Sequence, residues 1–245
     1  MLGYIIYGDG PKRPVLEEQR IAGGRFMVLR MGEPLRPKGP IAMRRARTAA
    51  RRLREAGVRS AVFPMDFPYT ALFLRQGVCP VETLGLRKAL AASLTRRRLE
   101  GLGLSPTEAV VGLSGERMSQ ELRDTVKALA LSFRYVLLDV QDDGGLAREL
   151  RREYGISLLL RPSPDQLERA DALLLFSPRG DLSGGNRVLY TLYPGGEGGR
   201  GRLPLVLPAA LENQTEPNCD REQLAAALFA QGILTLETLL AEIPC

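Results

Sequence analysis

The chain has 245 residues, of which 44% are hydrophobic and 25% charged, and its 34 basic and 28 acidic side chains give a formal net charge of +6. These fractions exclude a disordered or low-complexity chain, and no apolar run approaches the roughly 18 residues that a transmembrane helix needs. The chain contains no histidine, which excludes chemistry that depends on an imidazole as acid–base group or zinc ligand.

The first 40 residues predict two short strands within otherwise irregular chain. The strand candidates are the apolar runs 4–8 (YIIYG) and 26–30 (FMVLR), and polar, proline-containing segments separate and follow them. The N-terminus lacks a basic region ahead of its apolar residues, and the three cysteines form no CxxC pair. We therefore expect a cytoplasmic protein with reduced thiols.

An arginine-rich helix is predicted from residue 41 to residue 56, and Gly57 ends it. Alanines and Leu53 recur at a spacing of three to four residues and form a narrow stripe suited to close packing. Arginines share another side of the helix: Arg44, Arg47, Arg51 and Arg54. Because no aromatic residues interleave with them, a solvated surface is favoured, with nucleic-acid binding as the alternative.

A strand is predicted next at 60–64, then a short helix at 69–75 and a long helix at 81–99 that bridges two halves of the chain. Residues 1–105 hold 20 basic and 8 acidic side chains, whereas residues 106–245 hold 14 and 20. This difference predicts two units with different surfaces. The first is a basic α/β N-terminal domain, 1–105, which includes the bridging helix, and the second domain is 106–245.

Between residues 109 and 178, strand-like and helix-like runs alternate without interruption. The apolar runs are 109–113, 135–140, 156–160 and 171–176, and charged, helix-forming segments separate them. This order predicts a mostly parallel sheet with crossover helices, so the fold class is α/β, with a smaller α/β N-terminal half. In such sheets, ligands bind at the carboxyl ends of the strands.

The turn after the first of these strands, VVGLSGERMS at 110–119, stands where a phosphate-binding turn would stand. Gly112 and Gly115 would let the backbone approach a ligand closely, and Arg117 could contact a phosphate through its guanidinium. Asp139 lies near the end of the next strand, 24 residues after Gly115, where a ribose-binding acid is expected.

These residues give 109–178 a resemblance to the Rossmann-like dinucleotide-binding superfamily. The resemblance implies a site for NAD(P) or another nucleotide, formed by residues at the strand ends. The predicted contacts are Gly112, Ser114, Gly115, Arg117, Asp139 and Ser177. The third and sixth positions of the glycine fingerprint are Ser114 and Arg117 here, so a tight turn without a ligand is the alternative.

Two further groups of residues lie near the predicted site. The loop after the fourth strand, 177–186, should approach the turn, which makes Arg179 and Asp181 candidate contacts by position, with a solvated loop as the alternative. Asp142 and Asp143 follow the second strand, where acids commonly cap a helix. No metal site is expected, because no third ligand is identifiable elsewhere.

The remainder of the chain is less regular. A strand is predicted at 187–193 and a flexible glycine-rich segment at 194–202. A helix is predicted at 221–231 with Asp220 as its N-cap, and a closing helix after Thr235. Both C-terminal helices are assigned to the second domain.

Three functions are compatible with these observations. The order of a first half, a bridging helix, a Rossmann-like half and C-terminal helices resembles two-domain dehydrogenases of the shikimate-dehydrogenase type, but the first half offers no lysine–aspartate pair for such chemistry. The missing acid–base pair favours a non-catalytic Rossmann-like protein that binds a small ligand or a protein partner through a degenerate site. The alternatives are an NAD(P)- or nucleotide-dependent enzyme with an atypical GxxG turn, and a nucleic-acid-binding module that uses the helix at 41–56.

Overall fold

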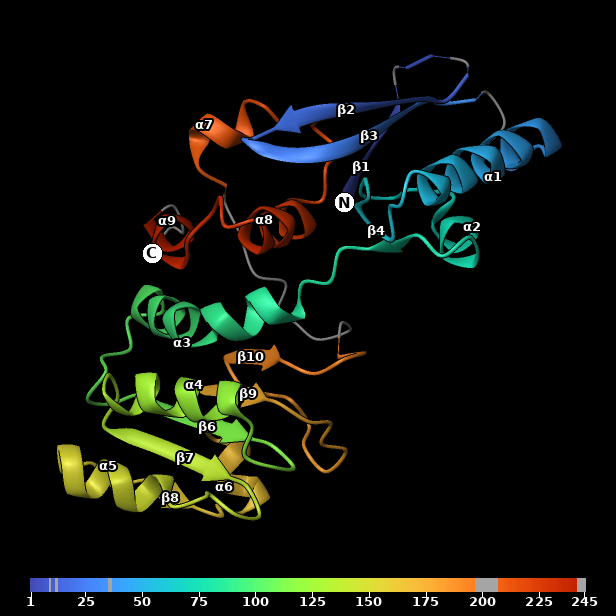
Figure 1. Cartoon of the computed structure of the whole chain (residues 1–245). Coiled ribbons are helices and arrows are strands. Elements are labelled where there is room, and N and C mark those ends of the chain that lie inside the picture. Colours follow the sequence, from blue (N-terminus) through green and yellow to red (C-terminus); the bar gives the residue numbers. More distant parts are fainter. Residues whose placement is uncertain (9, 12, 35–36, 197–206, 242–245) are drawn as a thin grey trace. The chain divides into compact units, whose positions relative to one another are not determined.

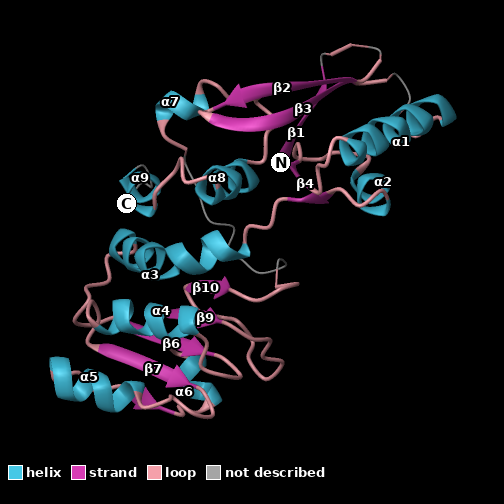
Figure 2. Cartoon of the chain, viewed as in Figure 1, coloured by secondary structure: helices cyan, strands magenta, loops and turns pink. Residues whose placement is uncertain are grey.

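The structure is a computed structural model that describes residues 1–245 apart from 9, 12, 35–36, 197–206 and 242–245 (Figure 1). The fold is α/β, and each of its two five-stranded sheets is accompanied by helices (Figure 2). The chain forms two compact units, of which the first contains Met1–Thr83 and Leu205–Glu242 and the second contains Leu84–Pro204. No helix in the described part of the chain is both long and apolar enough to cross a membrane.

The sheet of the first unit has the strand order β2-β3-β1-β4-β5. The strands are Leu2–Gly8 (β1), Val15–Ile21 (β2), Gly24–Gly32 (β3), Ser60–Val62 (β4) and Cys79–Pro80 (β5). β1 is parallel to β3 and β4, whereas β2 forms an antiparallel hairpin with β3. The strands predicted at 4–8, 26–30 and 60–64 are therefore confirmed.

Strand β2 corrects the prediction of a loop between β1 and β3. It pairs with β3 along its whole length, from Val15 opposite Arg30 to Ile21 opposite Gly24. Ile21 is the one buried residue among the seven of β2, all of which the structure describes. An edge strand with so few buried side chains lacks the apolar run by which strands are recognised.

Five helices accompany this sheet in the described residues: Pro40–Glu55 (α1), Thr70–Arg75 (α2), Ala209–Glu212 (α7), Arg221–Ala230 (α8) and Leu236–Ala241 (α9). The predicted alanine stripe of α1 is confirmed, because Ala46, Ala49, Ala50 and Leu53 are fully buried. An alanine stripe lets the helix backbone lie close to the sheet. Aromatic side chains from β1, from α2 and from the segment between β4 and α2 fill the adjoining core with edge-to-face contacts.

The C-terminal segment belongs to the first unit, and it accepts hydrogen bonds from backbone N–H groups of that unit. The Gln223 side chain of α8 accepts from the Phe63 backbone N–H at 2.9 Å, and the Asn218 carbonyl accepts from the Met65 N–H at 2.8 Å. Asp220 caps α8, as predicted, by accepting from two backbone N–H groups of the first turn.

The second unit contains a parallel sheet with the strand order β10-β9-β6-β7-β8. The strands are Val110–Ser114 (β6), Tyr135–Asp139 (β7), Leu159–Leu160 (β8), Ala172–Leu175 (β9) and Val188–Thr191 (β10). Its helices are Leu84–Gly101 (α3), Gln120–Ala130 (α4), Leu146–Tyr154 (α5) and Pro164–Glu168 (α6). The predicted parallel, Rossmann-like sheet is confirmed.

The division between the units differs from the predicted boundary at residue 105. Helix α3, predicted as a bridging helix of the first half, packs on α4, β9 and β10 and so lies in the second unit. Helix α8 packs on β4 and so lies in the first. The chain thus leaves the first unit at residue 83 and returns to it after residue 204.

Candidate functional site

The candidate site lies at the carboxyl ends of the strands of the second unit. From β6, the chain adds β7 and β8 on one side and β9 and β10 on the other, so the strand order reverses between β6 and β9. Ligands of open α/β sheets bind at such a reversal. A hollow of ≈ 770 Å³ lies there, lined by Ser114, Gly115, Glu116, Asp139, Val140, Gln141, Arg161, Ser177, Pro178 and Arg179. That volume lies within the usual range for small-molecule sites.

Two side chains at strand ends and one from the loop after β9 form a polar network in this hollow. Ser114 ends β6, and the sheet register places it beside Asp139 at the end of β7. The Ser114 Oγ donates to Asp139 Oδ2 at 3.1 Å, and Arg179 Nη1 donates to Ser114 Oγ at 2.9 Å and also to Asp139 Oδ2. The predicted candidates Ser114 and Asp139 are thus brought together, and the loop after β9 does reach them.

Arg179 also binds Asp181 through a two-pronged contact. Its Nε and Nη2 atoms each lie 2.8 Å from a carboxylate oxygen of Asp181. The hydrogen bonds raise the pKa of Arg179 and lower the pKa of Asp181 to about 2. Arg179 is thereby held between two carboxylates, with its side chain only 23% exposed.

The Asp181 ion pair predicts a dependence of stability on pH. Because the pKa of Asp181 is lower in the folded protein than in the unfolded chain, the pair stabilises the fold above pH ~4, and this contribution is lost as the pH falls toward ~2. The wild-type protein should therefore have a higher melting temperature than Asp181→Asn near neutral pH. This difference in melting temperature should shrink as the pH falls from ~4 to ~2. Thermal melts of both proteins from neutral pH to pH ~2 test this. A difference that stays constant with pH would show that the ion pair is not its source.

Arg161 supplies the hollow with a second cation, which the sequence reasoning missed. It follows β8, and its Nη2 donates to the Gln141 carbonyl at 2.9 Å while its own N–H donates to the Leu138 carbonyl at 3.0 Å. Its φ of 51° is left-handed, which is costly for a residue with a Cβ. No carboxylate pairs with Arg161 within the residues that the structure describes. Asp139 was predicted because it lies at the carboxyl end of a strand. The same reasoning, applied to the predicted strand at 156–160, would have identified Arg161.

The glycines of the predicted phosphate turn have packing roles. Gly112 lies inside β6, and a Cβ there would come within 3.1 Å of methyl groups of Leu167 and Leu173. A Cβ at Gly115 would lie 2.9 Å from a methyl group of Leu122 in α4. Gly115 lines the hollow, whereas Gly112 does not. Both glycines therefore let helices pack closely on the sheet.

The N-terminus of α4 is already occupied by side chains. Ser119 caps it by accepting from the Leu122 N–H at 3.2 Å. The pKa of Glu121 is lowered by hydrogen bonds from its own backbone N–H and from Ser119, and by the charge of Lys88. This carboxylate competes with a ligand phosphate for the helix terminus. Arg117 is exposed in the same loop and does not line the hollow.

Of the acidic residues after β7, Asp143 binds a backbone N–H in the first turn of α5, as expected of a capping acid, whereas Asp142 binds a backbone N–H in the turn before the helix. Asp142 accepts from the Gly144 N–H at 2.9 Å, and Asp143 accepts from the Ala147 N–H at 2.8 Å. No group of three potential metal ligands is found in the described ranges of the chain. Ser177 does line the hollow, two residues after β9 ends.

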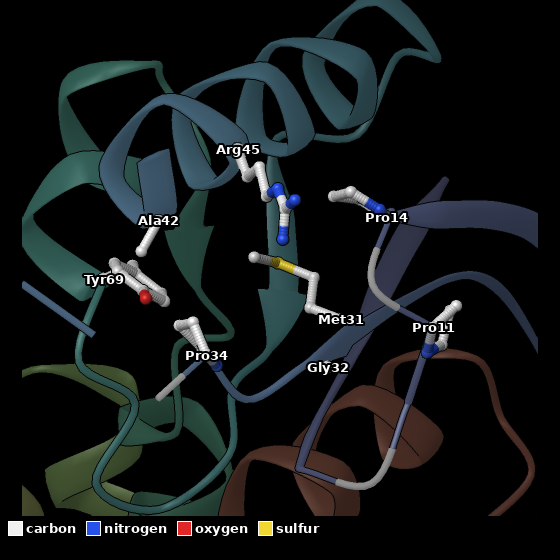
Figure 3. A pocket seen from close by; sticks show the side chains of 8 residues that line it. All are labelled: Pro11, Pro14, Met31, Gly32, Pro34, Ala42, Arg45 and Tyr69. Atoms are coloured by element: carbon white, nitrogen blue, oxygen red, sulfur yellow. The ribbon is translucent and has the colours of Figure 1, made fainter. Parts of the chain in front are cut away.

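Two other hollows are less suited to a ligand of nucleotide size. One of ≈ 330 Å³ adjoins the site, shares Arg179 with it, and is lined mainly by leucines, glycines and Tyr193. The other lies in the first unit, where Arg45 reaches from α1 toward Met31 and Pro14 (Figure 3). Its volume of ≈ 20 Å³ suffices for about one water molecule.

No protein family and no curated protein matches the sequence. Solved structures with a similar arrangement include L-tryptophan dehydrogenase from Nostoc punctiforme (12% identity, TM-score 0.34), the catalytic subunit of M. jannaschii aspartate transcarbamoylase (13%, 0.34) and a shikimate 5-dehydrogenase-like protein (14%, 0.25). These alignments cover 86%, 99% and 100% of this chain and 57%, 86% and 93% of those chains. The chain thus spans little more than half of the tryptophan dehydrogenase. TM-scores this low do not support assigning the activity of these proteins to this chain. The fold class is instead established by the strand order and direction of the two sheets.

Proposed function

We propose that the protein binds a small anionic, hydroxylated ligand of the nucleotide class in the hollow at the ends of β6, β7 and β9, and that it does not transform this ligand. One observation carries the proposal: the hollow at the strand-order reversal holds both a carboxylate, Asp139, and an arginine, Arg161. Arg161 has no carboxylate partner among the described residues, and its side chain donates to a backbone carbonyl. Arg161 would bind an anionic group, and Asp139 and Ser177 would bind hydroxyls.

The residues that line the hollow favour binding over catalysis. General acid–base catalysis near neutral pH needs a group that titrates there. Of the ionisable lining residues, Arg161 and Arg179 carry guanidinium groups, which do not act as proton donors or acceptors near neutral pH, and Asp139 accepts a hydrogen bond from Arg179. Glu116 is exposed to solvent. The lining as described thus offers no acid–base group tuned for proton transfer.

The proposal predicts binding that depends on Arg161 and Asp139. Isothermal titration with NAD(H), NADP(H), ATP and S-adenosylmethionine should show binding by at least one of them. Arg161→Gln and Asp139→Asn should each weaken it by about 10- to 100-fold, the usual effect of losing a hydrogen bond to a charged group. Arg148→Gln, which removes the same charge from an exposed position on α5 outside the hollow, should leave affinity within about twofold.

Two results would contradict the proposal. If none of the four compounds binds at millimolar concentration, the hollow is not a nucleotide site. If a bound nicotinamide cofactor is oxidised or reduced in the presence of a carbonyl or hydroxy-acid substrate, the protein is an enzyme and the non-catalytic part of the proposal is wrong.

A further inference from the structure

Helix α1 presents the first unit's most concentrated positive charge. Its 16 residues include six arginines and a single acidic residue, Glu55. Arg51 pairs with Glu55 at 3.4 Å, Arg52 donates to the Pro14 carbonyl, and Arg45 reaches the small hollow in Figure 3. The remaining three, Arg44, Arg47 and Arg54, are exposed and pair with no carboxylate of the described residues.

The lack of counter-charges on α1 contrasts with helices α4 and α8, whereas Arg148 and Arg151 of α5 also pair with no carboxylate of the described residues. On α4, Arg123 and Lys127 share Glu149 at 2.9 and 2.6 Å. On α8, Arg221 pairs with Glu212 at 2.7 Å.

The arrangement on α1 is also locally unfavourable. Arg44, Arg47, Arg51 and Arg54 follow one another at spacings of three and four residues, which places like charges beside each other on one side of the helix. The helix is held in place by its buried alanine stripe, so it tolerates this repulsion. A polyanion laid along the row would replace repulsion by attraction.

We propose that this row, Arg44, Arg47, Arg51 and Arg54, binds the phosphate backbone of duplex DNA without sequence preference. Guanidinium groups match phosphates in a two-pronged geometry. From Arg44 to Arg54 the row spans ten helical rises, or about 15 Å, which is the axial length of about four base pairs. This inference is independent of the ligand site in the second unit.

Burial of the neighbouring side chains favours duplex DNA over single-stranded nucleic acids and membrane surfaces. From residue 37 to residue 83, a range that the structure describes in full, the aromatic side chains are Phe63, Phe67, Tyr69 and Phe73, and all are buried. Single-stranded nucleic acids are bound largely by stacking on exposed aromatic rings, which this surface does not offer. Membrane-surface helices insert an apolar face, whereas the apolar stripe of α1 is buried against the sheet.

The test is fluorescence anisotropy with a labelled duplex of about 30 base pairs at several salt concentrations between about 50 and 200 mM. The wild-type chain should bind, with log affinity falling linearly against log salt. A variant with Arg44→Gln, Arg47→Gln and Arg54→Gln should bind at least tenfold more weakly at the lowest salt, and its slope should be shallower by about 2.7 for three lost phosphate contacts. The matched control carries Arg148→Gln, Arg151→Gln and Arg152→Gln on α5, which removes the same charge from exposed positions.

The control distinguishes a loss of affinity caused by removing this particular surface from one caused by lowering the net charge of the protein. It should keep the affinity and slope of the wild type, and circular dichroism should show equal helix content in all three proteins. Equal losses in both triple variants, or no binding by the wild type at the lowest salt, would overturn the proposal. Tighter binding to a single strand of the same sequence, to polyglutamate or to vesicles containing phosphatidylserine would overturn it as well.

Discussion

A Leu228→Ala variant is expected to lower the free energy of unfolding of the first unit by about 3 kcal/mol. Leu228 is fully buried on α8 and packs against β3 so closely that a Cβ at Gly24 would lie 2.7 Å from its Cδ2. Truncation to alanine removes this contact and leaves a cavity between α8 and the sheet. The expected decrease in melting temperature of this unit is about 10 °C.

The same experiment tests whether the two units unfold separately. The matched control is Leu129→Ala, which truncates a leucine that is 1% exposed on α4 in the second unit. By calorimetry, each variant should shift the transition of its own unit and leave the other in place. A single transition that both variants shift equally would show that the chain unfolds as one cooperative body.

The parallel sheet of the second unit could be predicted because its strands are continuous apolar runs. In β9, all four residues from Ala172 to Leu175 are buried, and in β7 Val136, Leu137 and Leu138 are buried. Strands covered on both faces have this composition, and helical segments of suitable length separate them. Local sequence therefore contained most of the information needed for this unit.

The first unit was harder to predict because its stability depends on contacts distant in sequence. Asn218 donates to the Tyr7 carbonyl at 2.7 Å, and Gln223 accepts from the Phe63 N–H. Amide side chains in a loop and on a helix surface give no local indication of a partner more than 150 residues away. The assignment of residues 205–242 to the first unit was therefore missed.

The convergence of several predicted residues could be foreseen from the sequence, whereas the contacts among them could not. Strand order and the carboxyl-end rule were sufficient to bring Ser114, Asp139 and Ser177 to one hollow. The ion pair of Arg179 with Asp139 depends on the path of a loop, which no periodicity encodes. The role of Gly112 was also not apparent, since a glycine that avoids a leucine and a glycine that approaches a ligand look alike in sequence.

A Gly112→Val variant is expected to lower the free energy of unfolding of the second unit by about 2 kcal/mol, because the added side chain overpacks the sheet. Its Cβ alone would lie 3.1 Å from methyl groups of Leu167 and Leu173, and both leucines are fully buried and cannot move aside easily. Chemical denaturation of the variant and the wild type measures the difference.

Gly180→Ala provides the control for Gly112→Val, because a Cβ at Gly180 would meet nothing within 4 Å and its φ lies outside the left-handed region. It should be neutral or slightly stabilising. If Gly112 instead serves a bound ligand, Gly112→Ala would leave stability unchanged and weaken nucleotide binding. A loss of stability with unchanged affinity would assign this glycine to the packing of α6 on the sheet, and it would remove half of the GxxG pattern from the evidence for a phosphate-binding turn.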